Sequence, residues 1–320
     1  MDLDTWACPV CYSRLSEHAG EVACGTEGRR YRQAGGLPVL VRPEQEDLLR
    51  EAEHYASAWK RTKWAVPRDV ILLLPYIKCH GWKQKAKSFR ELQGILGSPR
   101  ERRVVDVGAG TGWMSYRLAE DGFRCFATDI SSDSDVGLGG ATQFDRTPHQ
   151  FERAIATLDR WPFRSGSVDI AICNASLHYV ADLRWAVAEA ARVLRTDGVF
   201  VVMNSPVHRD PASANRAASH FRKRLRELGA SGGLLENHQH FVASELEKCL
   251  QDRFLNVLRH DPRYGFWFHA TRALRGAFVG MELASFPIYE ARVPRRFSNS
   301  TQKNSSLSQL ASASGTTTES

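Results

Sequence analysis

The sequence of 320 residues has no long hydrophobic run. Its longest apolar stretch, residues 70–74, is stopped by Pro75, whereas a helix that crosses a bilayer needs about 20 residues. The first residues also lack the positive and then apolar order of a secretory signal peptide. We therefore expect no membrane span and a cytoplasmic location.

The sequence also lacks an even number of cysteines and a concentrated block of one charge. The chain has seven cysteines, an odd number, and three of them fall near the N-terminus. This pattern suits reduced thiols or a metal better than a disulfide framework. The formal net charge is +7, and a basic excess can attract nucleic acid. Because basic and acidic residues alternate along the chain, we interpret them as an ordinary solvated surface.

Residues 103–129 follow the order strand, glycine turn, helix, strand. Glycines let the backbone approach a ligand where any Cβ would collide, and a helix that opens near Thr111 points free N–H groups at the ligand. Asp129 ends the second strand, where a carboxylate can accept hydrogen bonds from both hydroxyls of a ribose. The pattern predicts a nucleotide-cofactor site.

The glycine spacing distinguishes between cofactors. A dinucleotide site needs Gly-x-Gly-x-x-Gly, whereas this turn has Gly-x-Gly-x-Gly, and Trp113 stands where a third small residue would be needed. Asp106 adds a carboxylate near the turn, which is unfavourable beside a pyrophosphate and favourable beside the ammonium group of an amino acid. A cofactor that carries an amino acid and a ribose fits best, and a nicotinamide dehydrogenase is the least favoured enzyme.

With these residues, the segment VVDVGAGTG at 104–112 resembles motif I of class I S-adenosylmethionine-dependent methyltransferases. Two later segments resemble the same family in the same order: WPFRSGSVDIAICNASLH at 161–178 is similar to its fourth-strand segment, and LRTDGVFVV at 194–202 to its fifth-strand segment. Three ordered matches at βαβ intervals are more specific than one glycine motif. The resemblance covers roughly residues 100–205 and is weak elsewhere.

The resemblance implies an α/β fold with a doubly wound, seven-stranded, mostly parallel sheet of the Rossmann-like methyltransferase type, and S-adenosylmethionine as cofactor. The cofactor-binding residues that it implies are Asp106, Gly108, Ala109, Gly110, Gly112, Asp129, Ile130, Asp159 and Asn174. The adenine-binding acid is open between two positions. Asp159 is the available acid. Counted back from Pro162 along the sequence, however, the family's acid would fall nearer Thr157.

The N-terminal segment looks like the small zinc-ribbon (Trm112-like) module that often precedes such methyltransferases. Cys8 and Cys11 are spaced as a knuckle and Cys24 follows, and thiolates on a knuckle can hold zinc in a piece too small to be stable by burial alone. The family pattern has a fourth cysteine near position 27, where this chain has Glu27. Two alternatives stay open: three sulfurs completed by Glu27, His18 or water, and a ribbon that has lost its metal.

We expect four segments along the chain. Apolar residues at helical intervals predict two or three helices before the first glycine turn, and their aromatic residues either roof a pocket or, more commonly, pack on the core. The C-terminal tail has too few large apolar residues to offset the entropy of ordering. The segments are a zinc-ribbon-like module at 1–43, a helical lead-in at 44–100, the methyltransferase domain at 101–296 and a disordered tail at 297–320.

Three stretches of the methyltransferase domain carry additional features. Residues 131–140 are polar and glycine-rich, so they predict a loop rather than a helix, either draped over the adenosine or disordered at the surface. Residues 211–230 predict an inserted basic helix. Residues 264–269 hold an aromatic cluster in the region where the family often builds acceptor specificity.

Methyl transfer from a sulfonium requires alignment and, for some acceptors, a base. His178 follows the predicted fourth strand, at the carboxyl end where doubly wound sheets bind ligands, and an imidazole there is a candidate base. It could equally hydrogen-bond to a loop. Cys173 lies inside an apolar strand and is interpreted as core. Residues 174–177 lack the Asn/Asp-Pro-Pro-aromatic stretch of enzymes that methylate base amines.

The sequence thus predicts a methyltransferase that acts on a small-molecule or lipid-like acceptor. Methylation of ribosomal or transfer RNA is the second interpretation, favoured by the basic balance and the ribbon. A third is a non-catalytic cofactor-binding or scaffold protein with a vestigial glycine turn, against which the retained Asp106 and Asp129 argue. The oligomeric state and the methylated atom are not indicated.

Overall fold

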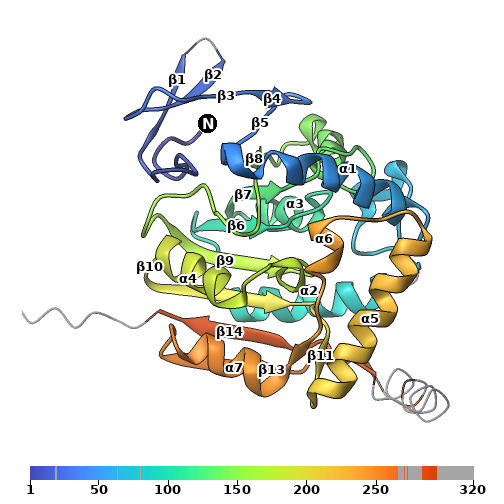
Figure 1. The fold of residues 1–320 in the computed structure, drawn as a ribbon. Helices are drawn as coiled ribbons and strands as arrows, with labels where there is room; N and C mark the ends of the chain where they lie inside the picture. Colours follow the sequence, from blue (N-terminus) through green and yellow to red (C-terminus); the bar gives the residue numbers. More distant parts are fainter. Residues whose placement is uncertain are drawn as a thin grey trace, which may run out of the picture.

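The computed structural model of this protein describes residues 1–18, 20–62, 64–79, 81–265, 270, 272 and 283–293. The tail expected to be disordered, at 297–320, lies outside the described residues. So does most of the aromatic cluster expected at 264–269, of which only Tyr264 and Gly265 are described. Figure 1 shows the arrangement of the helices and strands.

A central sheet of seven strands organises the molecule. In chain order its strands are β6 (Arg103–Val107), β7 (Arg124–Asp129), β8 (Glu152–Ile155), β9 (Val168–Asn174), β10 (Leu194–Met203), β13 (Asn256–His260) and β14 (Ile288–Arg292). Across the sheet the order is β13-β14-β10-β9-β6-β7-β8. Neighbours pair in parallel except at β14, which is antiparallel to β10 and β13. The predicted doubly wound, mostly parallel sheet of the Rossmann-like methyltransferase type is confirmed.

Helices cover both faces of this sheet because its strands are apolar on both sides. In β9, Ile170 and Ile172 belong to the core on one face, and Ala171 and Cys173 to the core on the other. The first face is packed by α2 (Trp82–Leu96) and α3 (Trp113–Glu120), and the second by α4 (Leu183–Val193) and α7 (Ala243–Gln251). Cys173 is fully buried, which confirms its interpretation as a core residue.

Two aromatic residues of the helical lead-in pack on the core instead of roofing a pocket. The rings of Trp82 and Phe89 lie edge-on to Trp113, with centroids 5.8 and 5.7 Å away. Such edge-to-face pairs stabilise a core beyond the area that they bury. Tyr76, in contrast, is exposed. Helix α2 is thereby fixed against α3, the helix that follows the glycine turn.

A layer of helices lies over the carboxyl end of β9. It consists of α1 (Asp47–Lys60), α5 (Pro211–Glu227) and α6 (Gly233–Glu236), which contact one another (Figure 1). The predicted basic helix is α5, and it begins where Asp210 accepts the N–H of Ser213 and Pro211 occupies the first turn. Tyr55 of α1 bonds to Tyr179, just beyond β9, through their hydroxyls at 2.7 Å.

The N-terminal segment extends the central sheet. It contains β1 (Leu15–His18), β2 (Glu21–Cys24), β3 (Arg30–Tyr31), β4 (Gln33–Ala34) and β5 (Leu37–Pro38). Beyond β5, Val39 forms a parallel bridge with Ile155 of β8. The N–H of Leu40 donates to the carbonyl of Ile155 at 2.8 Å. The segment therefore lies against the β8 edge.

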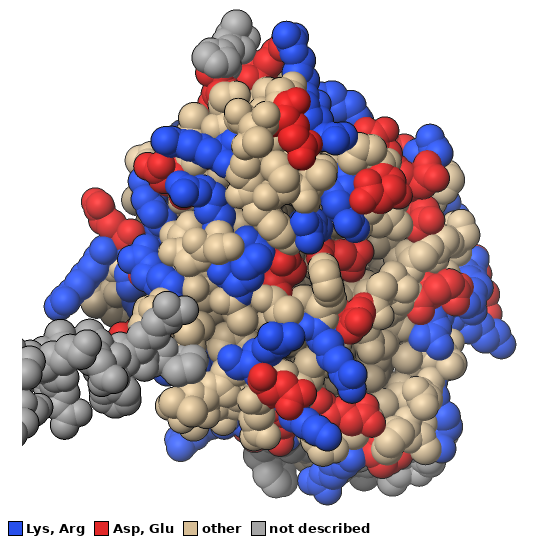
Figure 2. Space-filling model, turned by 60° about the vertical axis from the view of Figure 1, so that its left-hand side comes forward, with Lys and Arg blue, Asp and Glu red and all other residues tan. Residues whose placement is uncertain are grey.

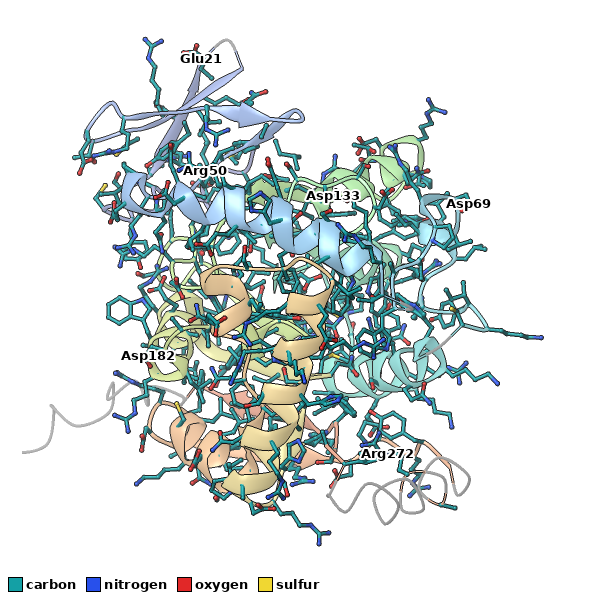
Figure 3. The ribbon with its side chains drawn as sticks, turned by 45° about the vertical axis from the view of Figure 1, so that its right-hand side comes forward. Glu21, Arg50, Asp69, Asp133, Asp182 and Arg272 are labelled. Atoms are coloured by element: carbon teal, nitrogen blue, oxygen red, sulfur yellow. The ribbon has the colours of Figure 1, made fainter. Side chains whose placement is uncertain are left out.

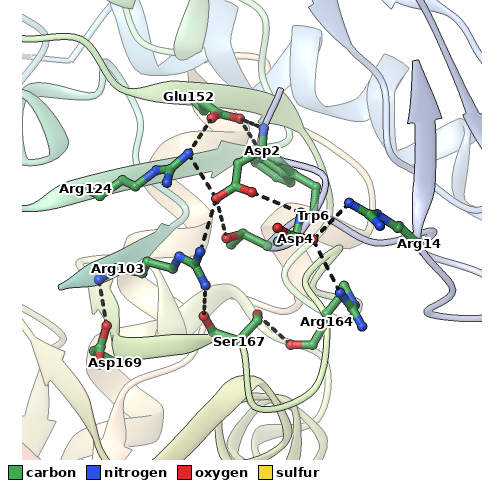
Figure 4. Close-up of polar contacts among 11 residues, drawn as sticks. Asp2, Asp4, Trp6, Arg14, Arg103, Arg124, Glu152, Arg164, Ser167 and Asp169 are labelled. Atoms are coloured by element: carbon green, nitrogen blue, oxygen red, sulfur yellow. Dashed lines mark hydrogen bonds and ion pairs between the residues drawn. The ribbon is translucent and has the colours of Figure 1, made fainter. Parts of the chain in front are cut away.

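Polar contacts and one buried indole hold the first residues on the sheet (Figure 4). Asp2 forms an ion pair with Arg124 of β7 at 3.1 Å, and the indole N–H of Trp6 donates to Glu152 of β8 at 2.7 Å. The Trp6 ring is fully buried, with its centroid 4.7 Å from that of Phe163. The N-terminal residues thus share one core with the sheet.

The polar segment after β7 folds into turns and a 3-10 helix, η3 (Leu138–Arg146). At Gly137 a Cβ would lie 2.4 Å from the carbonyl oxygen of Ser131, so the backbone approaches too closely for any other residue. Lys60 of α1 donates to Asp133 at 2.6 Å, and Figure 3 shows Asp133 beside this helix. Residues 131–137 form a loop attached to α1, as the poor helix propensity predicts, whereas η3 begins within the predicted loop at Leu138. The segment is ordered, in contrast to the alternative of a disordered loop.

The visible surface carries charges of both signs. Figure 2 shows lysine and arginine side chains interspersed with aspartate and glutamate. Some form exposed ion pairs, such as Arg30 with Glu21 at 2.8 Å, which stabilise little. Within the described ranges, no helix combines the length and the apolar character needed to span a membrane.

Candidate cofactor and acceptor site

The glycine turn between β6 and α3 adopts a backbone that only glycine accepts readily. Gly108, Gly110 and Gly112 have φ of +75°, +56° and +75°, in the left-handed region. A Cβ on Gly108 would lie 2.3 Å from the Cβ of Ser176. The N–H groups of Gly108 and Ala109 donate to the carbonyl of Thr128 at 2.8 and 2.9 Å. The turn is therefore fixed to the end of β7, where Asp129 stands.

Asp129 is oriented by the turn itself. Its Oδ2 accepts the N–H of Gly110 at 2.8 Å, and its Oδ1 accepts the N–H of Ser131 at 2.9 Å. Burial raises the pKa of this carboxyl. Each oxygen keeps a further lone pair, so the carboxylate can still accept from two hydroxyls. Ile130, the next residue, lines a small cleft together with Ser131 and Ile155.

Asp106 is the buried carboxylate of the turn. Its side chain is 1% exposed. Its Oδ2 accepts from the hydroxyl of Ser115 at 2.8 Å, whereas its Oδ1 has no hydrogen-bond partner in the described part of the chain. Burial raises the pKa of Asp106 to about 7. A buried acceptor without a donor is costly, and an ammonium group bound at the turn would supply that donor. The donor set thus fits the amino-acid end of S-adenosylmethionine.

The carboxyl ends of β9 and β10 carry a polar cluster. The Oδ1 of Asn174 accepts from the Nδ2 of Asn204 at 2.8 Å, and Ser88 of α2 donates to the Oδ1 of Asn204 at 3.0 Å. Ala175 and Asn204 have positive φ, at +57° and +55°. Left-handed residues other than glycine cluster at functional sites, so these two strand ends are candidates for the acceptor side.

The two candidates for the adenine-binding position lie beside the same glutamine. Gln45 donates to Asp159 Oδ2 at 3.3 Å, and Thr157 Oγ1 donates to Gln45 Oε1 at 3.4 Å. Burial raises the pKa of Asp159. Gln45 has no place in the sequence-based prediction, because it lies more than one hundred residues before these partners and outside any motif.

His178 is buried and hydrogen-bonded. Its Nδ1 lies 3.1 Å from the hydroxyl of Ser205. Burial, together with the neighbouring His240 and Lys85, lowers the pKa of His178 to about 3. The ring is therefore neutral at pH 7 and a weak proton acceptor in this state.

His178 belongs to a row of four histidines. The ring centroids of His178 and His238 are 5.0 Å apart, those of His238 and His240 5.4 Å, and those of His240 and His208 5.2 Å. Burial lowers the pKa of His238, and it lowers that of His240 to about 4. The pairing of Val207 with Phe241 brings His208 close to His240, although the two histidines are far apart in the sequence. Only the short His-x-His pattern at 238–240 signals the row in the sequence.

The three N-terminal cysteines lie together. One sulfur from each of Cys8, Cys11 and Cys24 falls within 4.8 Å of the others, and the sulfurs of Cys11 and Cys24 are 3.5 Å apart. Burial of Cys24 opposes ionisation, but hydrogen bonds from Ser13 and from the N–H of Glu27 lower its pKa to about 7. Thiolates are the form that zinc prefers, so the donor set fits this metal.

The carboxylate of Glu27 lies outside this group of sulfurs. Its backbone N–H points to the sulfur of Cys24 at 3.3 Å, and its carboxylate pairs with Arg29 at 3.4 Å. The side chain of His18, the other candidate, lies outside the described residues. The Ser13 hydroxyl, in contrast, lies 3.1 Å from the sulfurs of both Cys11 and Cys24.

Comparison with known proteins gives a family match at this site. Residues 105–202 match the family model described as "Methyltransferase domain". The chain is 31% identical to the malonyl-[acyl-carrier protein] O-methyltransferase of Geobacter sulfurreducens over 153 residues, which are 46% of this chain and 53% of that protein. It is 31% identical over 112 residues to the uncharacterized methyltransferase YcgJ of Bacillus subtilis, covering 35% and 44%. The chain thus spans about half the length of these curated relatives.

Solved structures show the same fold. Phosphoethanolamine N-methyltransferase 2 of Haemonchus contortus, solved in complex with S-adenosyl-L-methionine, superposes with a TM-score of 0.52 at 12% identity, covering 75% of this chain and 60% of that one. At such identity the likeness concerns the fold alone. The matched residues run from β6 to β10 and include the glycine turn, and together with the sheet order they identify this part of the chain as a class I S-adenosylmethionine-dependent methyltransferase domain.

Proposed function

We propose that this protein transfers the methyl group of S-adenosylmethionine to a small-molecule or lipid-like acceptor. The observation that carries the proposal is the unpartnered Oδ1 of the buried Asp106, beside a turn where Gly108 admits no Cβ. A scaffold with a vestigial turn would have no need of a buried carboxylate that lacks a donor, because a neutral residue there would be more stable.

The residues of the site divide into three roles in this proposal. Asp106 holds the ammonium group, Asp129 accepts from the ribose hydroxyls, and Gly108, Ala109, Gly110 and Gly112 let the backbone approach. Ile130 and Asp159 lie on the adenine side, with Thr157 as the alternative. Asn174 remains a predicted cofactor-binding residue, at the strand end that we propose for the acceptor side. When bound, the cofactor supplies an electrophilic methyl group, so the protein has to supply alignment and, for some acceptors, a base.

We propose alignment as the main source of catalysis, with His178 as the candidate base. A base of pKa about 3 accepts a proton poorly at pH 7, so this role requires that acceptor binding raise the pKa of the imidazole. The hydrogen bond to Ser205 also supports a role in positioning the loop after β9.

A small-molecule acceptor is supported by the curated relatives rather than by geometry alone. One relative is named for the O-methylation of malonyl-[acyl-carrier protein]. The RNA alternative has no specific support among the relatives. A cytoplasmic location stays a prediction, as do the segment boundaries at residues 43, 100 and 296.

We further propose that Cys8, Cys11 and Cys24 hold one zinc ion with a structural role. The support is the 4.8 Å grouping of their sulfurs and the lowered pKa of Cys24. Three sulfurs and one small donor would satisfy a tetrahedral ion. The metal-free ribbon is the alternative.

Two measurements test the methyltransferase proposal. Calorimetry should show binding of S-adenosylhomocysteine to the full chain. A cell metabolite extract incubated with protein and methyl-labelled S-adenosylmethionine should then take up label in a small-molecule fraction, and an RNA fraction serves as the parallel arm. If S-adenosylhomocysteine does not bind, the proposal is wrong. If the label appears only in RNA, the acceptor is RNA and not a small molecule.

A further inference from the structure

Lys85 stands out as a cation without an anion. It lies in the first turn of α2, and its Nζ is 4.2 Å from the centroid of the Trp82 ring. No ion pair or hydrogen bond of its ammonium group occurs among the residues that the structure describes. The lysine two positions later is satisfied, because Lys87 donates to the carbonyl of Tyr264 at 2.7 Å.

The contacts of α2 place Lys85 over the carboxyl edge of the sheet. On one side of Lys85, Trp82 packs against Trp113, which follows the glycine turn. On the other side, Ser88 bonds to Asn204 at the end of β10. Residues three apart on a helix share a face, so Lys85 lies between the turn and the strand ends.

The electrostatics agree with this placement. Lys85 is half-buried, and burial lowers its pKa to about 8. Its charge is one of the causes, after burial and His240, that lower the pKa of His178, so it lies near His178, four residues beyond the end of β9. Burying an unpaired ammonium group is costly, and its position at a helix N-terminus adds an unfavourable dipole term.

We propose that Lys85 binds an oxyanion of the methyl acceptor, a carboxylate or a phosphate group, so that the acceptor is an anionic molecule. This inference rests on the proposed function. It assigns the acid group of the acceptor to the β9 and β10 side, opposite to Asp106, whose negative charge repels it. Lysine suits either oxyanion, because it acts as a point charge with three donors.

Acylation of the lysines tests the oxyanion site without any turnover. The full chain is treated briefly with labelled acetic anhydride, and the modification of each lysine is read by peptide mass spectrometry. The protein is measured free, with S-adenosylhomocysteine, and with S-adenosylhomocysteine plus inorganic phosphate, acetate or, at equal ionic strength, chloride. Exposed Lys83, in the same helical turn, is the internal control.

We expect phosphate or acetate to slow the modification of Lys85 by roughly tenfold at ten times the half-protecting concentration, and to leave Lys83 unchanged. Which of the two anions protects at lower concentration distinguishes a phosphate from a carboxylate acceptor. Equal protection of both lysines, or none of either, overturns the proposal. Protection by S-adenosylhomocysteine alone, with no further effect of the anions, assigns Lys85 to the cofactor and also overturns it.

Variants extend the test to the labelled extract. We expect the labelled fraction to be retained on an anion exchanger, and Lys85→Met to lower the uptake at least tenfold, while Lys83→Met leaves it unchanged. Lys85→Arg, which keeps the charge, should restore part of the uptake. Label in a neutral fraction overturns the anionic acceptor but not the methyltransferase activity. If the protein binds no S-adenosylhomocysteine, the proposed function is wrong. The acylation experiment without this ligand still shows whether an anion binds at Lys85.

Discussion

At the scale of single residues, the two carboxylates of the site have different surroundings. Asp129 is bonded at both oxygens by backbone N–H groups, whereas Asp106 has one oxygen without a partner. The first is ready to accept from hydroxyls, and the second lacks a donor. Their responses to mutation and to pH should therefore differ.

With the proposed ribose assignment, Asp129→Ala should remove two charge-assisted hydrogen bonds to the cofactor. We expect the affinity for S-adenosylhomocysteine to weaken by about 2–4 kcal/mol, measured by calorimetry. Asp145→Ala, at an exposed acid outside the site, is the matched control. Unchanged affinity in the Asp129 variant would exclude the ribose assignment.

Asp106 should make cofactor binding depend on pH. Its pKa of about 7 in the free protein is raised by burial, and a bound ammonium group favours the charged carboxylate and lowers that pKa. Affinity should then rise as the pH increases through about 6 to 7 and level off above it, with proton release on binding below pH 7. Calorimetry in two buffers of different ionisation enthalpy measures the released proton. Asp106→Asn should bind more weakly and show neither effect.

The raised pKa of Asp106 also affects the stability of the cofactor-free protein. The free energy of unfolding should fall as the pH rises, whereas the cofactor affinity should increase. For an acid whose folded pKa lies above its unfolded value, the stabilising contribution is complete below the unfolded pKa, near 4, and is lost as the pH rises through about 7. Urea unfolding of the free protein should show this loss in the wild type and not in Asp106→Asn.

His178→Gln separates the two roles of the imidazole, because an amide can keep a hydrogen bond to Ser205. If the ring mainly positions the loop, turnover should stay within about tenfold of the wild type. A general base would instead lose about 10²–10⁴-fold in kcat, with little change in cofactor affinity. Steady-state kinetics on the identified acceptor decide between these outcomes.

The sequence predicts the residues of the glycine turn because their chemistry is local. The positions 106, 108, 110 and 112 lie within one loop, and the terminal acid follows one helix later. Lys85 and Gln45 have no such signal. In the sequence, a lysine in the first turn of a helix is interpreted as a solvated charge, and only the fold places it beside Trp82 and the strand ends. Gln45 acquires its partners only through tertiary packing.

At the scale of elements, local patterns predict those whose composition is unambiguous. Residues 211–230 predict α5 because an aspartate and a proline mark its start. The η3 helix and the β11–β12 pair, Val207–His208 with Phe241–Val242, have no such pattern, since packing alone sets their conformation.

The cysteine knuckle is an element whose stability should depend on a metal. We expect elemental analysis of protein prepared without chelator to give close to one zinc per chain. Removal by chelator should lower the melting temperature, because a bound metal stabilises only the folded state. Cys11→Ser, at the exposed cysteine, should reproduce the loss, and Cys79→Ser, at an exposed cysteine outside the cluster, should not. A metal content near zero, with unchanged melting, would leave a metal-free ribbon.

At the scale of the whole molecule, the N-terminal segment and the methyltransferase sheet form one packed body. The rings of Trp6 and Phe163 belong to the same core, and Val39 pairs with Ile155. Sequence reasoning predicts both units but not their union, because contacts between distant segments leave no local pattern. Tyr12 also joins the two units. Its ring lies between the guanidinium groups of Arg160 and Arg192, whose Cζ atoms are 3.9 and 3.7 Å from the ring centroid.

Trp6→Ala should therefore destabilise the entire fold. The indole is fully buried, and removal of such a ring leaves a cavity and takes one hydrogen bond from Glu152, at a cost of about 3–5 kcal/mol. Urea unfolding followed by circular dichroism measures the loss. Trp185→Ala, at a half-exposed indole, should cost much less. A local effect, with the sheet unfolding at its wild-type urea concentration, would mean that the segment is an independent unit.

The contact of Trp6 with Glu152 spans 146 positions of the chain, which bears on synthesis. A ribosome makes residues 6–40 well before their partners at Ile155 and Phe163, which emerge only after a long further stretch of chain. Pairings over such distances form slowly, so the nascent segment must wait with its indole exposed to water. This segment is thus synthesised well before the residues against which it packs, and it is among the last parts of the fold to reach its final position.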